Sequence, residues 1–144
     1  MHKLNVLRRS PRGSLARDLA EQICDDGMQG KVAIVVDRPG AILAATRKQW
    51  LKLMRRAQRD RSSTLDTLKI AQLTQQIAWM QMLRFTATAP DDLLEADVTF
   101  ATAEDFVRMP PVCRVVYVTY EFDKEKLHML TSWMPEGSRV VIYE

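Results

Sequence analysis

Glycine is scarce in this chain, with only five among 144 residues. None of them forms GxxxxGK[ST], and no GxGxxG follows the first apolar run at residues 31–37, so the usual phosphate-binding loops are absent. Histidine is rarer still. His2 lies near the beginning and His128 lies in a charged segment, which excludes a histidine-based zinc site or a serine triad. The sequence therefore indicates no cofactor, no metal and no established catalytic motif.

Cysteine and long apolar runs are also nearly absent. Cys24 and Cys113 lie far apart in apolar patterns, without a CxxC motif, so we expect two buried free thiols. No window approaches the roughly 18 apolar residues of a membrane span, and the basic N-terminus has no signal-peptide core. These absences predict a cytoplasmic protein with no membrane partner.

The overall composition is that of a folded protein. Hydrophobic residues make up 47% and charged residues 27%, which predicts one α/β domain over residues 1–144. Pro11 and Gly13 separate residues 1–13 from the rest, and we expect those residues to be a flexible arm. The net charge of +3 is only mildly basic, so any binding to a polyanion must depend on local clustering.

The hydrophobic periodicity predicts a Rossmann-like three-layer fold. Residues 31–37 are a nearly unbroken β-branched run, typical of a central strand covered on both faces. Two long helices follow, one from about 41 to 61 and one from a Ser63 or Thr64 cap to about 86. Short helices then alternate with strands at 98–102, 113–120 and 138–143. The order α-β-α-α-β-α-β-α-β predicts a mainly parallel, four-stranded sheet with a long helical pair after the first strand.

Acidic residues are nearly absent from one segment, RKQWLKLMRRAQRDR at residues 47–61. It holds seven Lys or Arg residues but a single acid, Asp60. On a helix, one sector opposite Trp50 contains Lys48, Lys52, Arg55, Arg56 and Arg59. No Glu–Lys pairs at i, i+4 neutralise this sector. Its counterpart is nucleic-acid phosphate, an acidic membrane, an acidic protein, or the four acids of residues 91–97. A membrane is the least favoured of these, because the apolar side of the helix is needed for the core. Our first hypothesis is a non-catalytic binding module that presents this basic helix face.

A second hypothesis places function at the carboxyl ends of the strands, where ligands gather in open α/β sheets. The residues expected there are Asp37, Arg38, Glu104 and Glu121, with Thr102, Asp105, Thr119 and Asp123 beside them. Such carboxylates suit a magnesium-dependent enzyme or an effector-binding domain. They equally suit capping of the helices that follow. Whether the protein is an enzyme therefore stays open, with the binding module favoured.

The second long helix carries a weaker apolar band opposite its main stripe. The band consists of Leu68, Ala71, Ala78, Trp79 and Met82. A helix that is apolar on two sides is usually buried on two sides. We expect this helix to be sandwiched between the sheet and the basic helix. The alternative is a homo-oligomer or protein interface through Leu68, Trp79 and Met82.

Overall fold

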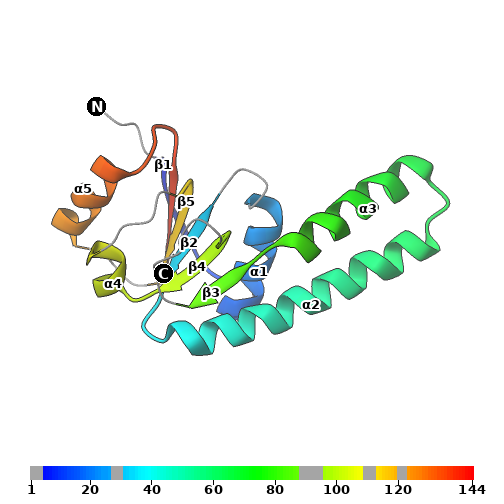
Figure 1. Ribbon diagram of the computed structural model, residues 1–144, viewed down its shortest axis with the longest axis horizontal. Helices are drawn as coiled ribbons and strands as arrows, with labels where there is room; N and C mark the ends of the chain where they lie inside the picture. The colour runs from blue at the N-terminus through cyan, green and yellow to red at the C-terminus, as the bar shows by residue number, and fades with distance from the viewer. Residues whose placement is uncertain (1–4, 27–30, 88–95, 109–112, 120–122) are drawn as a thin grey trace.

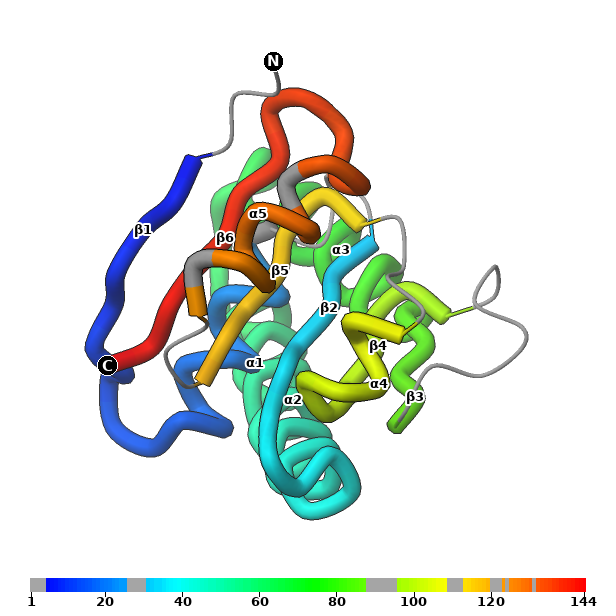
Figure 2. Tube along the Cα trace, turned by 90° about the vertical axis from the view of Figure 1, so that its left-hand side faces the viewer, coloured from blue at the N-terminus to red at the C-terminus, as the bar shows by residue number. Residues whose placement is uncertain are grey.

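Parallel strands form one sheet in the computed structural model, in the order β1-β6-β5-β2-β4-β3 (Figure 2). The structure describes residues 5–26, 31–87, 96–108, 113–119 and 123–144. Within these residues the strands are β1 (Asn5–Arg9), β2 (Val32–Val35), β3 (Phe85–Ala87), β4 (Val98–Ala101), β5 (Val115–Val118) and β6 (Arg139–Tyr143). The predicted parallel α/β class is confirmed, with six strands in place of four.

The first long apolar run occupies the middle of the sheet, as predicted. β2 pairs with β4 on one side and β5 on the other, and Val32 is aligned with both Val98 and Val115. All four residues of β2 are buried. An unbroken apolar run suits this position because each side chain meets an apolar layer, whichever face it points to.

Both additional strands lie at edges of the sheet, in places where the sequence indicated something else. Residues 5–9 were expected in a flexible arm, but they form β1, which pairs in parallel with β6. Four of its five residues are exposed, so the strand carries no apolar pattern that would reveal it. Residues 85–87 were expected at the end of a helix, but they form β3, where Phe85 packs against Trp50 and Phe100.

Helices cover both faces of the sheet (Figure 1). One face is covered by α1 (Leu15–Asp26) and the base of the long pair α2 (Pro39–Ser63) and α3 (Thr67–Met82). The other is covered by α4 (Ala103–Arg108) and α5 (Lys124–Trp133). Each face has its own apolar core: Ile34 and Tyr117 belong to the first, and Val35 and Val116 to the second. This is the three-layer arrangement that the alternating periodicity predicted.

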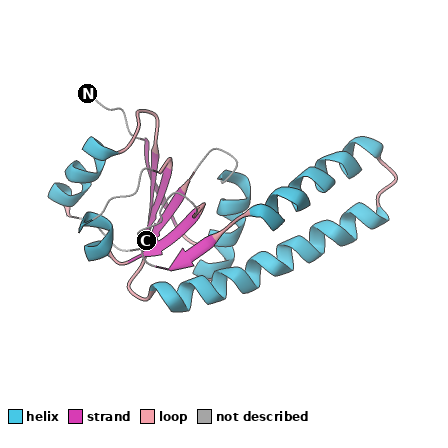
Figure 3. Ribbon diagram, in the orientation of Figure 1, coloured by secondary structure: helices cyan, strands magenta, loops and turns pink. Residues whose placement is uncertain are grey.

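The pair α2–α3 is a helical hairpin that extends beyond the sheet (Figure 3). Asp66 caps the N-terminus of α3 by accepting hydrogen bonds from the amides of Leu68 and Lys69. The prediction that Ser63 or Thr64 caps this helix is therefore wrong. The expected sandwich of α3 between the sheet and α2 is wrong. Ile77 and Met80 are its only buried residues, and Leu68 and Met82 on the opposite side are exposed. An amphipathic pattern specifies that a face is apolar, but not what covers it.

Candidate nucleic-acid interface

Trp50 fixes how α2 is oriented. Its side chain is buried, its indole nitrogen donates a hydrogen bond of 3.3 Å to the Met80 carbonyl of α3, and its ring meets Phe85 and Trp79 edge-on at 5.5 and 5.8 Å. Thr46 and Ala57 are buried on the same helix. Because this side of α2 is held against α3 and β3, the opposite side must face solvent.

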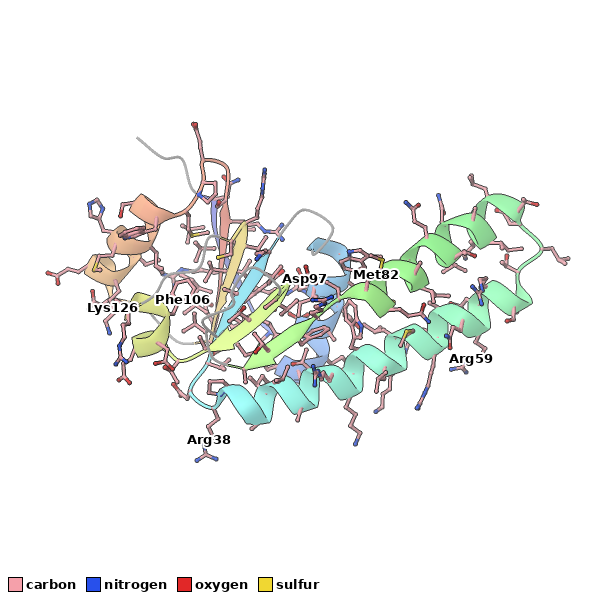
Figure 4. The ribbon with its side chains drawn as sticks, in the orientation of Figure 1. Arg38, Arg59, Met82, Asp97, Phe106 and Lys126 are labelled. Atoms are coloured by element: carbon pink, nitrogen blue, oxygen red, sulfur yellow. The ribbon has the colours of Figure 1, made fainter. Side chains whose placement is uncertain are left out.

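The exposed side of α2 is a row of cations that we call the basic face. It consists of Lys48, Lys52, Arg55, Arg56 and Arg59, and all five side chains are exposed. Figure 4 shows Arg59 extending from the side of α2 that faces away from α3. Within the described part of the chain, none of the five forms an ion pair. The row therefore carries positive charge that no ion pair within the described residues neutralises.

Arg47, at the margin of the same segment, has a different role. Its guanidinium donates a hydrogen bond of 3.1 Å to the carbonyl of Phe85 and lies 5.8 Å from the centre of that ring. These contacts attach α2 to the edge strand β3. Of the seven basic residues in the segment, Arg47 thus helps to stabilise the fold.

Helix α1 lies beside the basic face and contributes one cation and one anion, paired with each other, to its margin. Lys52 and Arg56 line a hollow of about 220 Å³ together with Arg17 and Glu21 of α1. The Arg17 guanidinium lies 3.5 Å from the Glu21 carboxylate, within one turn of α1. No sequence pattern indicates this neighbourhood, because α1 and α2 are separated by a buried strand and meet only in the folded chain.

The acids of residues 91–97, the counterpart expected within the chain, are mostly outside the described residues. Asp91, Asp92 and Glu95 belong to the undescribed stretch 88–95. Asp97 is described, and its carboxylate accepts a hydrogen bond of 3.0 Å from the amide of Arg84. Figure 4 places Asp97 near the sheet end of the hairpin, well apart from Arg59. Asp97 therefore stabilises the connection from α3 to β3, beside the start of β4.

The carboxyl ends of β2 and β5 bring together part of the second predicted site. Asp37, Arg38 and Thr119 line an open hollow of about 470 Å³, whose remaining wall is apolar and comes from Leu15, Val36, Ala41, Ile42 and Ala45. The Thr119 hydroxyl donates a hydrogen bond of 3.0 Å to the Val35 carbonyl. The hollow thus lies between the start of α1, the start of α2 and the carboxyl ends of β2 and β5, the edge of the sheet where ligands bind in such folds.

The other acids predicted for this edge do not line the hollow. Glu104 is exposed in the first turn of α4, on the opposite face of the sheet, and Glu121 lies outside the described residues. The Thr102 hydroxyl accepts a hydrogen bond from the Asp105 amide, and Asp123 caps α5 through the amides of Glu125 and Lys126. Among the described residues, no group of three His, Cys, Asp or Glu side chains is arranged to hold a metal ion. Thr102 and Asp123 thus act as helix caps.

The three residues of the predicted partner surface on α3 differ in exposure. Leu68 and Met82 are 68% and 76% exposed. Trp79 is half-buried, because its ring packs against Trp50 on the side of α3 that faces the body of the protein. The exposed part of the band is therefore the side of α3 that faces away from α2.

A buried polar cluster that the sequence did not reveal joins both ends of the chain to α1. Asp18 is fully buried, accepts two hydrogen bonds of 2.7 Å from Arg9 of β1, and accepts a third of 2.8 Å from the Tyr143 hydroxyl of β6. Burial alone would raise the pKa of Asp18, but the hydrogen bonds from Arg9 and Tyr143 hold that pKa below its usual range. Burial and the bond to Asp18 raise the pKa of Tyr143.

The chain matches no protein-family model and no curated protein. Among the described residues, no helix combines the length and apolar character that crossing a membrane requires.

Proposed function

We propose that the protein is a binding module whose basic face, on α2, contacts the sugar-phosphate backbone of nucleic acid. The observation that carries this proposal is a row of five exposed cations with no ion-pair partner in the described part of the chain. Cations this close on one helix repel one another, at roughly 0.2–0.5 kcal/mol for each pair at i, i+4 spacing. Phosphate groups would relieve that repulsion.

The shape of α2 suits an extended, evenly charged ligand. From Lys48 to Arg59 the row covers eleven residue steps, or about 16 Å along the helix axis. The hairpin extends away from the sheet, so a duplex can approach the row without meeting α4 or α5 (Figure 1). Long, flexible Lys and Arg side chains on phosphates position a protein but do not read base edges. We therefore expect binding that is weak and insensitive to sequence.

Salt dependence is the direct test of this function. With four or five phosphates engaged on duplex DNA, the logarithm of affinity should fall with the logarithm of salt concentration at a slope of about −4. Replacing Lys52, Arg55 and Arg59 with Gln should make that slope shallower by about three units, because every phosphate that no longer meets a cation keeps about one counterion. Fluorescence anisotropy with labelled duplexes of unrelated sequence measures both quantities.

A matched control separates the basic face from the net charge. The exposed cations Arg108, Arg114 and Lys126 lie outside the α2–α3 hairpin, and replacing all three with Gln removes the same total charge. This control should leave the slope unchanged. If both triple variants lose affinity equally, or if binding ignores salt, the basic face is not the binding surface.

A second candidate function is supported by the hollow at the carboxyl ends of β2 and β5. Its apolar wall, with Asp37, Arg38 and Thr119 at the margin, suits a small amphipathic molecule, bound either as an effector or as a substrate. Asp37→Asn tests this reading, because Asp37 is exposed and its replacement should not disturb folding. A nucleic-acid-binding module should tolerate the change, whereas a ligand site should lose affinity in a thermal-shift screen of small metabolites.

A further inference from the structure

The exposed side of α3 has the residue spacing of a helix-pairing surface. Alternating steps of three and four residues connect Leu68, Ala71, Gln75, Ala78 and Met82, all of them exposed, and we call this row the back stripe. It lies opposite Ile77 and Met80, the buried residues of α3. Such 3-4 spacing is what helices use when they pack side by side along their length. In the described part of the chain nothing covers the stripe.

Charge decides what kind of surface the back stripe can meet. Within the 16 residues of α3 the only charged side chain is Lys69, and it does not belong to the stripe. Exposed helices normally carry charge on their solvent side. A neutral row of Leu, Ala, Gln and Met offers nothing to nucleic acid or to a highly charged protein. Its complement is another neutral helix face, and α3 itself is such a face.

We propose that the back stripe pairs two copies of this chain, with the two α3 helices antiparallel around a two-fold axis at Gln75. Gln75 lies at the middle of the stripe, seven residues from both Leu68 and Met82, so an axis there gives the greatest overlap. Ala71 then faces the partner's Ala78, where small side chains let the helices approach closely, and Leu68 faces the partner's Met82. The two Gln75 amides meet at the axis, where each can both donate and accept a hydrogen bond.

The hairpin has room for this pairing, but the contact is small. α3 stands clear of the sheet along most of its length (Figure 3) and spans about 24 Å. One pair of helices of this length covers less than the roughly 800 Å² per partner of a standard interface. Leu65, 98% exposed before the cap of α3, can extend the contact. We therefore expect a weak dimer, with a Kd on the order of 10 to 100 µM.

The dimer has a consequence that rests on the proposed nucleic-acid binding. Each α2 packs on the side of its α3 that faces away from the back stripe, and each basic face points outward from that hairpin. Pairing through the back stripe therefore puts the two basic faces on opposite outer sides of the dimer. Such an assembly would bridge two nucleic-acid segments.

Sedimentation equilibrium without nucleic acid tests the pairing. The wild-type chain should shift from monomer to dimer as its concentration rises through the micromolar range. Gln75→Glu and Gln75→Lys should each stay monomeric, because like charges then meet at the two-fold axis. An equimolar mixture of the two variants should form dimers again, because opposite charges meet. Gln81→Glu and Gln81→Lys are matched controls on the flank of α3 and should dimerise like the wild type.

The result overturns the proposal if the wild-type chain stays monomeric, if both Gln75 variants still dimerise, or if their mixture does not associate. Circular dichroism establishes that each variant is helical before the comparison is made. The bridging consequence is measured separately, as capture of a labelled duplex by a bead-bound duplex, which Gln75→Glu should lose while it still binds a single duplex. If the dimer forms but no duplex binds, the nucleic-acid proposal fails and the pairing stands.

Discussion

Arg9 and Asp18 are joined by two parallel hydrogen bonds of 2.7 Å, from Nε to Oδ2 and from Nη2 to Oδ1. The carboxylate is fully buried, whereas 27% of the Arg9 side chain remains exposed. Tyr143 donates to the same carboxylate at 2.8 Å. The pair therefore connects β1, α1 and β6, and it explains how a strand with so little apolar character is held at the edge of the sheet.

Replacing Asp18 with Asn should destabilise the protein. Asn keeps the shape but removes the charge, which leaves the Arg9 guanidinium without its counterion and disturbs the bond from Tyr143. Because Arg9 is partly solvated, we expect a loss of about 2–4 kcal/mol in unfolding free energy, at or below the usual cost of breaking a buried pair. Urea unfolding measures this loss. Asp60→Asn, an exposed acid at the tip of α2, should change little.

The same pair predicts a specific loss of stability in acid. Although burial favours the neutral form of Asp18, hydrogen bonds from Arg9 and Tyr143 keep its folded pKa below the unfolded value, which is about 4. Its contribution is therefore complete above pH 4 and is lost as the pH falls through the folded pKa. The difference in unfolding free energy between wild type and Asp18→Asn should shrink over that range. A difference independent of pH would contradict this assignment.

Trp50 should be the main anchor of the hairpin. Trp50→Ala removes a buried ring and its hydrogen bond to Met80, and we expect the free energy of unfolding to fall by about 3–5 kcal/mol. The change should also loosen the packing of Trp79 and Phe85, so hydrogen exchange in α3 should accelerate more than exchange in β2. Leu51→Ala, at the next position but 46% exposed, is the control and should cost little.

The two thiols should differ in reactivity. Cys113 is buried in the core between the sheet and α4–α5, and burial raises its pKa to about 12. Burial also raises the pKa of Cys24, although that half-buried thiol accepts a hydrogen bond of 3.0 Å from the Gln76 amide. In native protein we expect slow modification of Cys24 and none of Cys113. Cys113 should react only on unfolding, measured in Cys24→Ser with a thiol reagent. Rapid native labelling of Cys113 would contradict its burial in this core.

The amino-acid sequence by itself determined the elements that carry their own apolar pattern. β2 could be placed at the centre of a parallel sheet because every residue from Val32 to Val35 is apolar, and only a strand covered on both faces has that composition. The basic face could be predicted because charge and burial on a helix follow directly from residue spacing, with Trp50 opposite the cations. Both predictions depend only on neighbours along the chain.

Tertiary structure decided whatever depends on partners distant in sequence. β1 exists because Arg9 meets Asp18 and the strand pairs with β6, more than a hundred residues away, and no local pattern encodes that meeting. Helix α3 ends before Phe85 because that ring finds Trp50 and Phe100 across the sheet edge. The exposure of Leu68 and Met82 could likewise not be predicted from the sequence. An apolar face on a helix shows only that it can be covered, whereas the surface that covers it depends on how the whole chain folds.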